Sequence, residues 1–284
     1  MNGLINLYKP RGMSSAQAVG KVKRILGEKH VGHMGTLDPM AEGVLVIGVG
    51  KSARLFDYIS GRMKTYIAKF EFGYETDTLD ALGEVVNRTD DIPSVDAALG
   101  AVRSLVGEID QIPPVYSAKH VDGKRAYALA RDGKEVELKP SRVTIYDAQL
   151  ICQPRMNEMV FEITCSSGTY IRAICRDVAK MCGSLATLTY LQRTRSGLFD
   201  IKDSITLDNL EELKEKALIA PQNALDMPRF SVDSKLYDEL IHGRRIECET
   251  DGDSLIFCND EFFGIGCSVN GVLKLKTYLK DGGI

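Results

Sequence analysis

The chain has 284 residues, enough for one large domain or two unequal ones. Hydrophobic residues make up 44% and charged residues 26%, a balance that argues against a disordered, collagen-like or membrane protein. The longest nearly uninterrupted apolar run, residues 44–50, is far shorter than the roughly 20 residues that span a bilayer. Seven cysteines without a Cys-x-x-Cys pair indicate reduced thiols, and the N-terminus lacks the pattern of a secretion signal. We therefore expect a cytoplasmic protein.

The net charge of −3 conceals an uneven distribution. Residues 1–70 contain 11 Lys and Arg against 4 Asp and Glu, whereas residues 71–110 contain 2 against 10. Basic residues again exceed acidic ones in 115–145, by 7 to 4, and in 165–196, by 5 to 1. Separate basic blocks of this kind are compatible with one nucleic-acid-binding face, although taken alone they also suit ordinary solvated surface.

The hydrophobic periodicity predicts strands and helices that are interleaved irregularly. The predicted strands are 4–8, 66–72, 142–151 and 159–165, the last two forming a hairpin, and residues 44–49 suit either a buried strand or a short packed segment. The predicted helices are 15–26, 53–59, 95–106, 169–181 and 207–218. Because several strands follow one another directly, the pattern favours an α+β fold over a doubly wound parallel sheet.

Residues 220–229 contain two prolines and few apolar side chains, which predicts a linker. Beyond it, short apolar runs at 254–258, 262–267 and 272–275 are separated by Asn-Asp and Asn-Gly turns. This order predicts a small all-β module over residues 229–284.

The segment GHMGTLDPMAEGVL at residues 32–45 combines glycines, a proline, a histidine and one aspartate directly before an apolar run. Gly32 and Gly35 permit tight backbone turns, and Pro39 biases Asp38 towards an extended conformation. Such a loop can hold one carboxylate at the rim of a packed core. The composition also suits a structural turn in which Asp38 acts only as a local cap.

This segment resembles the signature loop of the TruB family of tRNA pseudouridine synthases. Further motifs resemble that family in the same order along about residues 4–200. They are KPRGMSS at 9–15, KTY at 64–66, GYETDTLD at 73–80, QIPPVYSAKHVDGKRAYALAR at 111–131, CSSGTYIR at 165–172 and LQRTRSG at 191–197.

The resemblance implies a mixed, largely antiparallel sheet flanked by helices. It implies a catalytic domain at 1–228, in which 115–140 form an RNA-gripping insertion, and a small PUA-like domain at 229–284. The net charge of −3 in this last segment weighs against strong RNA contact there. The implied activity is isomerisation of uridine 55 in the T arm of tRNA to pseudouridine.

The resemblance also implies roles for individual residues. Asp38 is the catalytic carboxylate, Arg172 keeps it ionised, and Tyr66 stacks on the target uracil within reach of the proton lost at C5. The expected substrate-binding residues are His33, Tyr66, Tyr170, Leu191, Lys9, Lys124 and Arg125. The sequence leaves open whether Asp38 adds to C1′ of the sugar, adds to C6 of the base or assists elimination.

This chemistry involves no redox change and no external nucleophile, so we expect no cofactor, metal or nucleotide. The expected partner is the T stem-loop of tRNA, whose uridine must be flipped out of its stack, and we expect the protein to act as a monomer. Two alternatives are an RNA-binding protein in which the loop is incidental, and a metal-dependent hydrolase that uses Asp38, Asp77 and Asp80 with His33.

Overall fold

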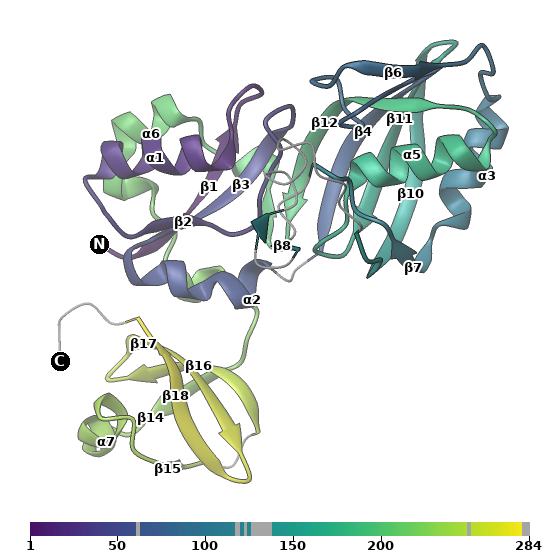
Figure 1. Cartoon of the computed structure of the whole chain (residues 1–284). Helices are drawn as coiled ribbons and strands as arrows, with labels where there is room; N and C mark the ends of the chain where they lie inside the picture. Colours follow the sequence, from purple (N-terminus) through teal and green to yellow (C-terminus); the bar gives the residue numbers. More distant parts are fainter. Residues whose placement is uncertain (61–62, 117–119, 122–123, 126–137, 249–250, 280–284) are drawn as a thin grey trace.

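A computed structural model of the chain describes residues 1–60, 63–116, 120–121, 124–125, 138–248 and 251–279. Its main element is a nine-stranded sheet with the strand order β1-β3-β12-β4-β11-β10-β7, to which β2 is added beside β3 and β13 beside β12 (Figure 1). All pairs are antiparallel except β3 with β12. The expected α+β class with a mixed, largely antiparallel sheet is therefore confirmed.

The main sheet and its neighbouring ribbons contain the strands β1 (Gly3–Lys9), β2 (Val31–His33), β3 (Glu42–Val49), β4 (Lys64–Phe72), β5 (Tyr74–Thr76), β6 (Val85–Arg88), β7 (Gly107–Gln111), β8 (His120–Val121), β9 (Lys124–Arg125), β10 (Ser141–Arg155), β11 (Glu158–Cys165), β12 (Ala186–Ser196) and β13 (Phe199–Asp200). The helices that flank it are α1 (Ser15–Leu26), α2 (Phe56–Ser60), α3 (Val95–Ser104), α5 (Ile171–Met181) and α6 (Leu207–Leu213). In the described residues, no helix is long and apolar enough to cross a membrane.

The predicted elements form where local chemistry and burial agree. In β4 the alternate residues Tyr66, Ala68, Phe70 and Phe72 are buried, as the period of two requires. Helix α1 begins after Ser14, whose hydroxyl accepts a hydrogen bond from the Gln17 backbone N–H in a capping box, and ends at Gly27 with φ +66°. The predicted hairpin is the antiparallel pair β10 and β11.

Two of the observed helices are shorter than the spacing of their apolar residues predicts. Residues 53–59 divide into a 3₁₀ segment, Gly50–Leu55, and the short helix α2. The 207–218 helix leaves the α conformation after Leu213, and Lys214–Ala217 is a 3₁₀ turn, with Lys214 at φ +50°. Periodicity alone does not separate these tighter turns from an α-helix, since both place i and i+3 side chains close together.

The C-terminal segment forms a second sheet of five strands in the order β14-β16-β17-β18-β15 (Figure 1). Its elements are β14 (Arg229–Val232), α7 (Tyr237–Ile241), β15 (Ile246–Glu247), β16 (Gly252–Cys258), β17 (Glu261–Val269) and β18 (Val272–Tyr278). The Asn259-Asp260 and Asn270-Gly271 turns have positive φ at both residues, as two-residue hairpin turns require. The all-β prediction overlooked the single-turn helix α7.

The predicted linker at 220–229 packs against the protein rather than running free. Its Ala224 and Leu225 are buried in a hydrophobic cluster that also contains Leu4 and Val46 of the main sheet and Ile265 of the C-terminal sheet. Apolar side chains on both sides of residue 228 thus share one cluster. The division into 1–228 and 229–284 stays a prediction.

The contact between β3 and β12 leads to a stability prediction. Gly43 has φ +101°, and a Cβ added there would lie 2.3 Å from the Arg193 carbonyl oxygen of β12. Gly27 also has positive φ, but a Cβ there meets nothing within 4 Å. We expect Gly27→Ala to lower the unfolding free energy by about 1–2 kcal/mol. Gly43→Ala should lower it by clearly more, as measured by urea unfolding. Equal losses would contradict the close approach of β3 and β12.

Candidate active site

Asp38 lies in the loop that connects β2 to β3, and the surrounding chain fixes the backbone of this loop. The Ser15 hydroxyl, in the first turn of α1, accepts a hydrogen bond from the Leu37 N–H and lies within donating distance of the Leu37 carbonyl, both at 2.9 Å. On the other side of Asp38, the Pro39 carbonyl accepts the Gly12 N–H at 2.8 Å. The backbone is thus held on both sides of Asp38.

Two buried cations brace the same loop. The Arg193 guanidinium is almost fully buried and donates to the carbonyls of Val44, Thr36 and Gly35 at 2.7, 3.2 and 3.1 Å. The Lys9 ammonium, which has no exposed surface, donates to the carbonyls of Pro10, Met13 and Ala41 at 3.0, 2.6 and 2.6 Å. Because backbone carbonyls are obligatory acceptors, both side chains fix loop conformation through satisfied hydrogen bonds.

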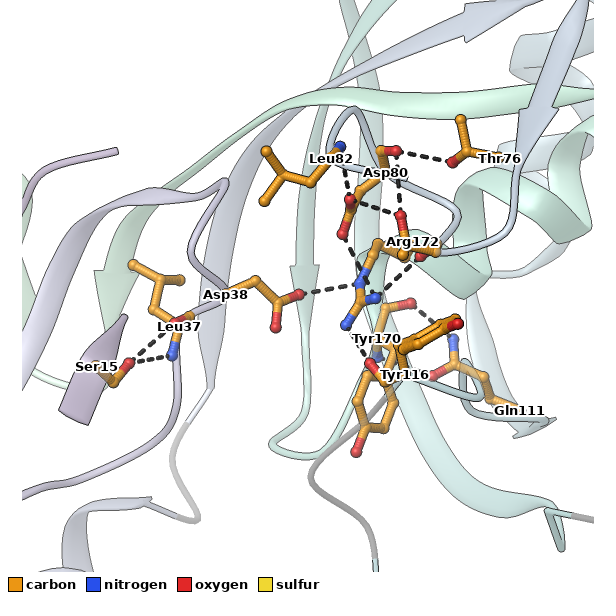
Figure 2. A network of polar contacts seen from close by, with 11 residues as sticks. Ser15, Leu37, Asp38, Thr76, Asp80, Leu82, Gln111, Tyr116, Tyr170 and Arg172 are labelled. Carbon is orange, nitrogen blue, oxygen red and sulfur yellow. Dashed lines mark hydrogen bonds and ion pairs between the residues drawn. The ribbon is translucent and has the colours of Figure 1, made fainter. Parts of the chain in front are cut away.

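Arg172 joins the Asp38 loop to the opposite part of the sheet (Figure 2). Its Nε lies 3.0 Å from Oδ2 of Asp38, and its Nη1 lies 3.5 Å from Oδ2 of Asp80. Its Nη1 and Nη2 also donate to the carbonyls of Thr78 and Tyr116, both at 3.0 Å. The Arg172 side chain is 5% exposed, whereas that of Asp38 is 32% exposed. A buried cation therefore faces a carboxylate that a substrate can reach.

The contact between Arg172 and Asp38 is an ion pair and not a directed hydrogen bond, because the Nε–H does not point along it. Asp80 is held more firmly. Its Oδ1 accepts from the Thr78 hydroxyl at 2.8 Å and from the Leu82 N–H at 3.0 Å. The two carbonyls therefore orient the guanidinium by hydrogen bonds, the anchored Asp80 carboxylate adds an ion pair at 3.5 Å, and Asp38 is held by charge attraction.

Tyr170 is the N-cap residue of α5, two residues before Arg172. Its N–H donates to Oε1 of Gln111 at 2.8 Å, and the Gln111 amide donates back to the Tyr170 carbonyl at 3.2 Å (Figure 2). Gln111 is the last residue of β7 and is buried. This reciprocal pair fixes the N-terminus of α5 against the sheet.

Tyr66 and Leu191 lie on the adjacent strands β4 and β12, and both side chains are buried. Burial raises the pKa of the Tyr66 phenol, and the neighbouring Arg193 guanidinium opposes that shift without cancelling it. The phenol is therefore neutral at pH 7. A neutral, flat ring suits stacking on a base, and a phenolate base is disfavoured at this position.

Of the predicted site residues, the structure places Arg172 of α5 beside Asp38 of the β2–β3 loop. Tyr170 precedes α5, and Tyr66 and Leu191 lie on the adjacent strands β4 and β12. His33 ends β2, beside α1, at the start of the loop. Lys9 is placed differently from the expectation, because its three carbonyl contacts give it a bracing position beneath the loop and leave no surface for substrate. The side chains of Lys124 and Arg125, and much of the 115–140 insertion, lie outside the described residues.

Three functional candidates were missed from the sequence: Ser15, Asp80 and Arg193. Each stands within a motif quoted above, but its partner is distant in sequence, so spacing gives no signal for the contact. Asp80 had a role only in the hydrolase alternative, as a metal ligand. In the part of the chain that the structure describes, no group of three or more His, Cys, Asp or Glu side chains is placed to hold a metal.

Comparison with protein families gives two matches. Residues 23–171 match the TruB family pseudouridylate synthase N-terminal domain, and residues 172–226 match the tRNA pseudouridylate synthase B C-terminal domain. The chain belongs to the TruB family of pseudouridylate synthases. It is thus an enzyme of the isomerase class, and the resemblance seen in the motifs is confirmed.

Curated relatives extend this match over most of the chain. A protein of Thermosipho melanesiensis named tRNA pseudouridine synthase B is 38% identical, with 100% of this chain and 97% of the relative covered. A protein of Syntrophotalea carbinolica with the same name is 43% identical over 78% of this chain and 71% of the relative.

Solved structures show the same fold at low sequence identity. A chain in the crystal structure of a Cbf5-Nop10-Gar1 complex superposes with a TM-score of 0.71 at 23% identity, covering 97% of this chain and 79% of that chain. A chain of an archaeal box H/ACA sRNP Nop10-Cbf5 complex gives 0.69 at 20% identity, covering 97% and 85%. These likenesses establish the architecture.

The buried lysine of β4 generates a pH prediction. Burial, with the nearby Arg193 charge, lowers the pKa of Lys64 to about 8. Between about pH 8 and the ordinary lysine pKa near 10.4, the unfolded chain retains a proton that the native chain releases. The unfolding free energy gains a contribution that rises with pH in this window, by at most about 1.4 kcal/mol per pH unit.

Lys64→Met should remove this contribution, so its unfolding free energy should rise less steeply with pH than that of the wild type between pH 8 and 10. Chemical denaturation at several pH values measures both slopes. Lys21→Met, on the exposed face of α1, is the matched control and should keep the wild-type slope. Identical slopes in all three proteins would rule out the lowered pKa of Lys64.

Proposed function

We propose that this enzyme converts uridine 55 in the T arm of tRNA to pseudouridine, with Asp38 as the catalytic carboxylate. The observation that carries the proposal is the reachable Asp38 carboxylate 3.0 Å from the buried Arg172, in a chain of the TruB family. The names of the curated relatives, tRNA pseudouridine synthase B, support tRNA as the substrate.

The proposed reaction breaks the N1–C1′ bond of uridine and forms a C5–C1′ bond. The proton at C5 is lost and N1 regains a proton, so atoms and electrons balance without an oxidant or a reductant. Asp38 can enter by adding to C1′, by adding to C6 or by assisting elimination at the sugar. All three routes need an ionised carboxylate within reach of the flipped nucleotide.

Arg172 supplies the fixed positive charge that this carboxylate needs. A guanidinium favours the ionised carboxylate beside it and stays protonated throughout the pH range of proteins. Because Asp80 and two backbone carbonyls orient the guanidinium, its position does not depend on Asp38. The guanidinium therefore keeps its position while the Asp38 carboxylate forms and breaks its bond to the substrate.

The surrounding residues would hold the base and the displaced RNA. Flipping a uridine costs a few kcal/mol, which contacts in the bound state must offset. We propose that Tyr66 stacks on the uracil, that Tyr170 and Leu191 line the pocket, and that His33 contacts nucleotides displaced by flipping. Lys124 and Arg125, in the 115–140 insertion, would contact phosphates. Action as a monomer, the cytoplasmic location and the domain division at residue 228 stay predictions.

The RNA-binding alternative requires no catalytic geometry. A binding protein gains nothing from keeping a buried guanidinium between two carboxylates, since burying charge costs free energy unless the partners compensate it. The catalytic proposal accounts for this arrangement.

The decisive assay uses the purified protein and an unmodified tRNA T stem-loop, without added metal or nucleotide. Chemical mapping should find one uridine converted to its C-glycoside by the wild type. Asp38→Asn should abolish this conversion but keep RNA affinity within about tenfold, or roughly 1.4 kcal/mol. Asp96→Asn, in the first turn of the distant helix α3, should behave as the wild type. Turnover by Asp38→Asn would exclude the carboxylate as the catalytic group.

Replacement of Arg172 tests the cation. Arg172→Ala leaves Asp38 and Asp80 facing each other without a counter-charge, so we expect at least a hundredfold loss of kcat and a destabilisation of about 3–5 kcal/mol. Arg172→Lys keeps the charge but loses the planar fork, and it separates a folding defect from a catalytic one. Arg176→Ala, one turn later on α5, is the control, because Arg176 pairs with Asp177 and not with Asp38. Near-normal kcat in a folded Arg172→Ala protein would refute the role.

A further inference from the structure

Glu42 is the first residue of β3 and follows closely after Asp38 in the chain. Its Oε1 accepts a hydrogen bond from the Tyr190 hydroxyl at 2.8 Å and another from the Gln192 side-chain amide at 3.1 Å. Both donors lie on β12. The reaction described above gives this carboxylate no role, although it joins the start of β3 to the next strand of the sheet.

The two donors are in the protonation state that these hydrogen bonds require. Burial raises the pKa of the Tyr190 phenol, and its hydrogen bond to Glu42 raises this pKa further. The phenol therefore keeps its proton at pH 7 and can donate it. The Gln192 amide is a donor at every pH. Two directed hydrogen bonds to one oxygen fix the carboxylate relative to β12.

Side chains connect β3 to β12 on both faces of the sheet. The backbone ladder between these strands is limited to Glu42 with Gln192 and Gly43 with Arg193. Because successive residues of a strand point to opposite faces, the side chains of Glu42 and Arg193 leave the sheet on opposite sides. Arg193 donates to the carbonyls of the Asp38 loop and of β3 on one side, and Glu42 accepts from β12 on the other.

The other contacts that hold the Asp38 loop come from its own side of this ladder. Ser15, Gly12 and Lys9 belong to α1, to β1 or to the turn between them, and β1 pairs with β3. Arg172 lies on α5, which packs against β12. The separation of Asp38 and Arg172 therefore depends on how β3 is placed against β12.

A short hydrogen-bonded turn connects Glu42 to Asp38. The Ala41 N–H donates to the Asp38 carbonyl at 3.1 Å, and the Lys9 ammonium donates to the Ala41 carbonyl at 2.6 Å. Burial lowers the pKa of Lys9 to about 8, and the charges of Asp38 and Glu42 both oppose this shift, so both carboxylates lie near the ammonium. A displacement of Glu42 is therefore transmitted to Asp38.

We propose that Glu42 is a positioning residue for the reaction and that, by accepting hydrogen bonds from Tyr190 and Gln192, it holds Asp38 at its place beside Arg172. This inference rests on the proposed function, because Glu42 acts through Asp38 and not on the substrate. A carboxylate that only stabilised the sheet would have the same contacts. The two roles differ in their effect on the chemical step of the folded enzyme.

The first test removes the acceptor. Glu42→Ala loses both hydrogen bonds, and a reacting group misplaced by about 1 Å can cost roughly a hundredfold in rate. On an unmodified T stem-loop, we expect the single-turnover rate constant at saturating enzyme to fall at least about tenfold. The Kd for the RNA, taken from the enzyme-concentration dependence of the rate, should change less than about twofold, since no RNA contact is removed.

Glu162→Ala, at an exposed position of β11, is the matched control and should keep the wild-type rate constant and Kd. Urea unfolding establishes that each variant is folded under the assay conditions. A purely structural role would lower the unfolding free energy of Glu42→Ala and leave its rate constant at the wild-type value. That result would overturn the proposal.

The second test restores the acceptor without the charge. Glu42→Gln keeps an oxygen that can accept from Tyr190 and Gln192. Because a neutral acceptor makes a weaker hydrogen bond than a carboxylate, we expect a loss of about threefold, much smaller than that of Glu42→Ala. An equal loss in Glu42→Gln and Glu42→Ala would contradict positioning through these hydrogen bonds.

The third test asks whether Glu42 acts together with its donor. Tyr190→Phe removes only the hydroxyl and should lower the single-turnover rate constant about threefold. In the Glu42→Ala background the same change should have no further effect, because the acceptor is already absent. Losses that multiply independently would overturn the proposal. Failure of the proposed function is distinguishable, because the wild type itself would then leave all uridines unconverted.

Discussion

The active site depends on one buried guanidinium that two carboxylates share across the sheet. Asp80 and the carbonyls of Thr78 and Tyr116 orient Arg172, and Asp38 reaches the same group from the β2–β3 loop. Burying a charge is favourable only when its partners compensate the lost hydration. Asp80 and the two carbonyls compensate the lost hydration of Arg172, so the Asp38 carboxylate can be both charged and accessible. The other features of the site serve to keep these groups in place.

The charges of the two cations that brace the loop are also compensated in the interior, in this case by backbone carbonyls. Arg193 and Lys9 carry their charges into the protein interior, where they donate hydrogen bonds to carbonyls on either side of Asp38. A loop rich in glycine has many accessible conformations, and fixing it costs conformational entropy. The buried cations offset that cost with hydrogen bonds that only one loop conformation satisfies. The conformation of the loop is therefore fixed by residues that lie far from it in the sequence.

Features that depend on local sequence patterns were predictable, and features that depend on contacts between distant residues were not. Elements with strong local signals were predicted well, such as the alternation in β4 and the capped helix α1. The 11-residue strand β12 was missed because its burial does not alternate regularly. Short strands such as β2 and β13, and the single-turn helix α7, were missed because a few residues carry too little pattern. The motifs predicted Asp38, Tyr66 and Arg172, whereas the bracing of Lys9 and the orienting contact of Asp80 arise from tertiary packing. The spacing of residues in the sequence does not predict which backbone carbonyl a buried cation will contact.

The short parallel pairing of β3 with β12 has a mechanical consequence. The ladder between these strands consists of Glu42 with Gln192 and Gly43 with Arg193, while the neighbouring pairs β1–β3 and β12–β4 continue along most of their length. Asp38 belongs to one side of this seam and Arg172 to the other. Because few backbone hydrogen bonds cross this seam, the separation of the Asp38 carboxylate and the Arg172 guanidinium depends on the Arg193 side chain of β12, which donates across it to the carbonyls of Val44, Thr36 and Gly35. A substitution there would imitate a defect in chemistry although it touches no reacting atom.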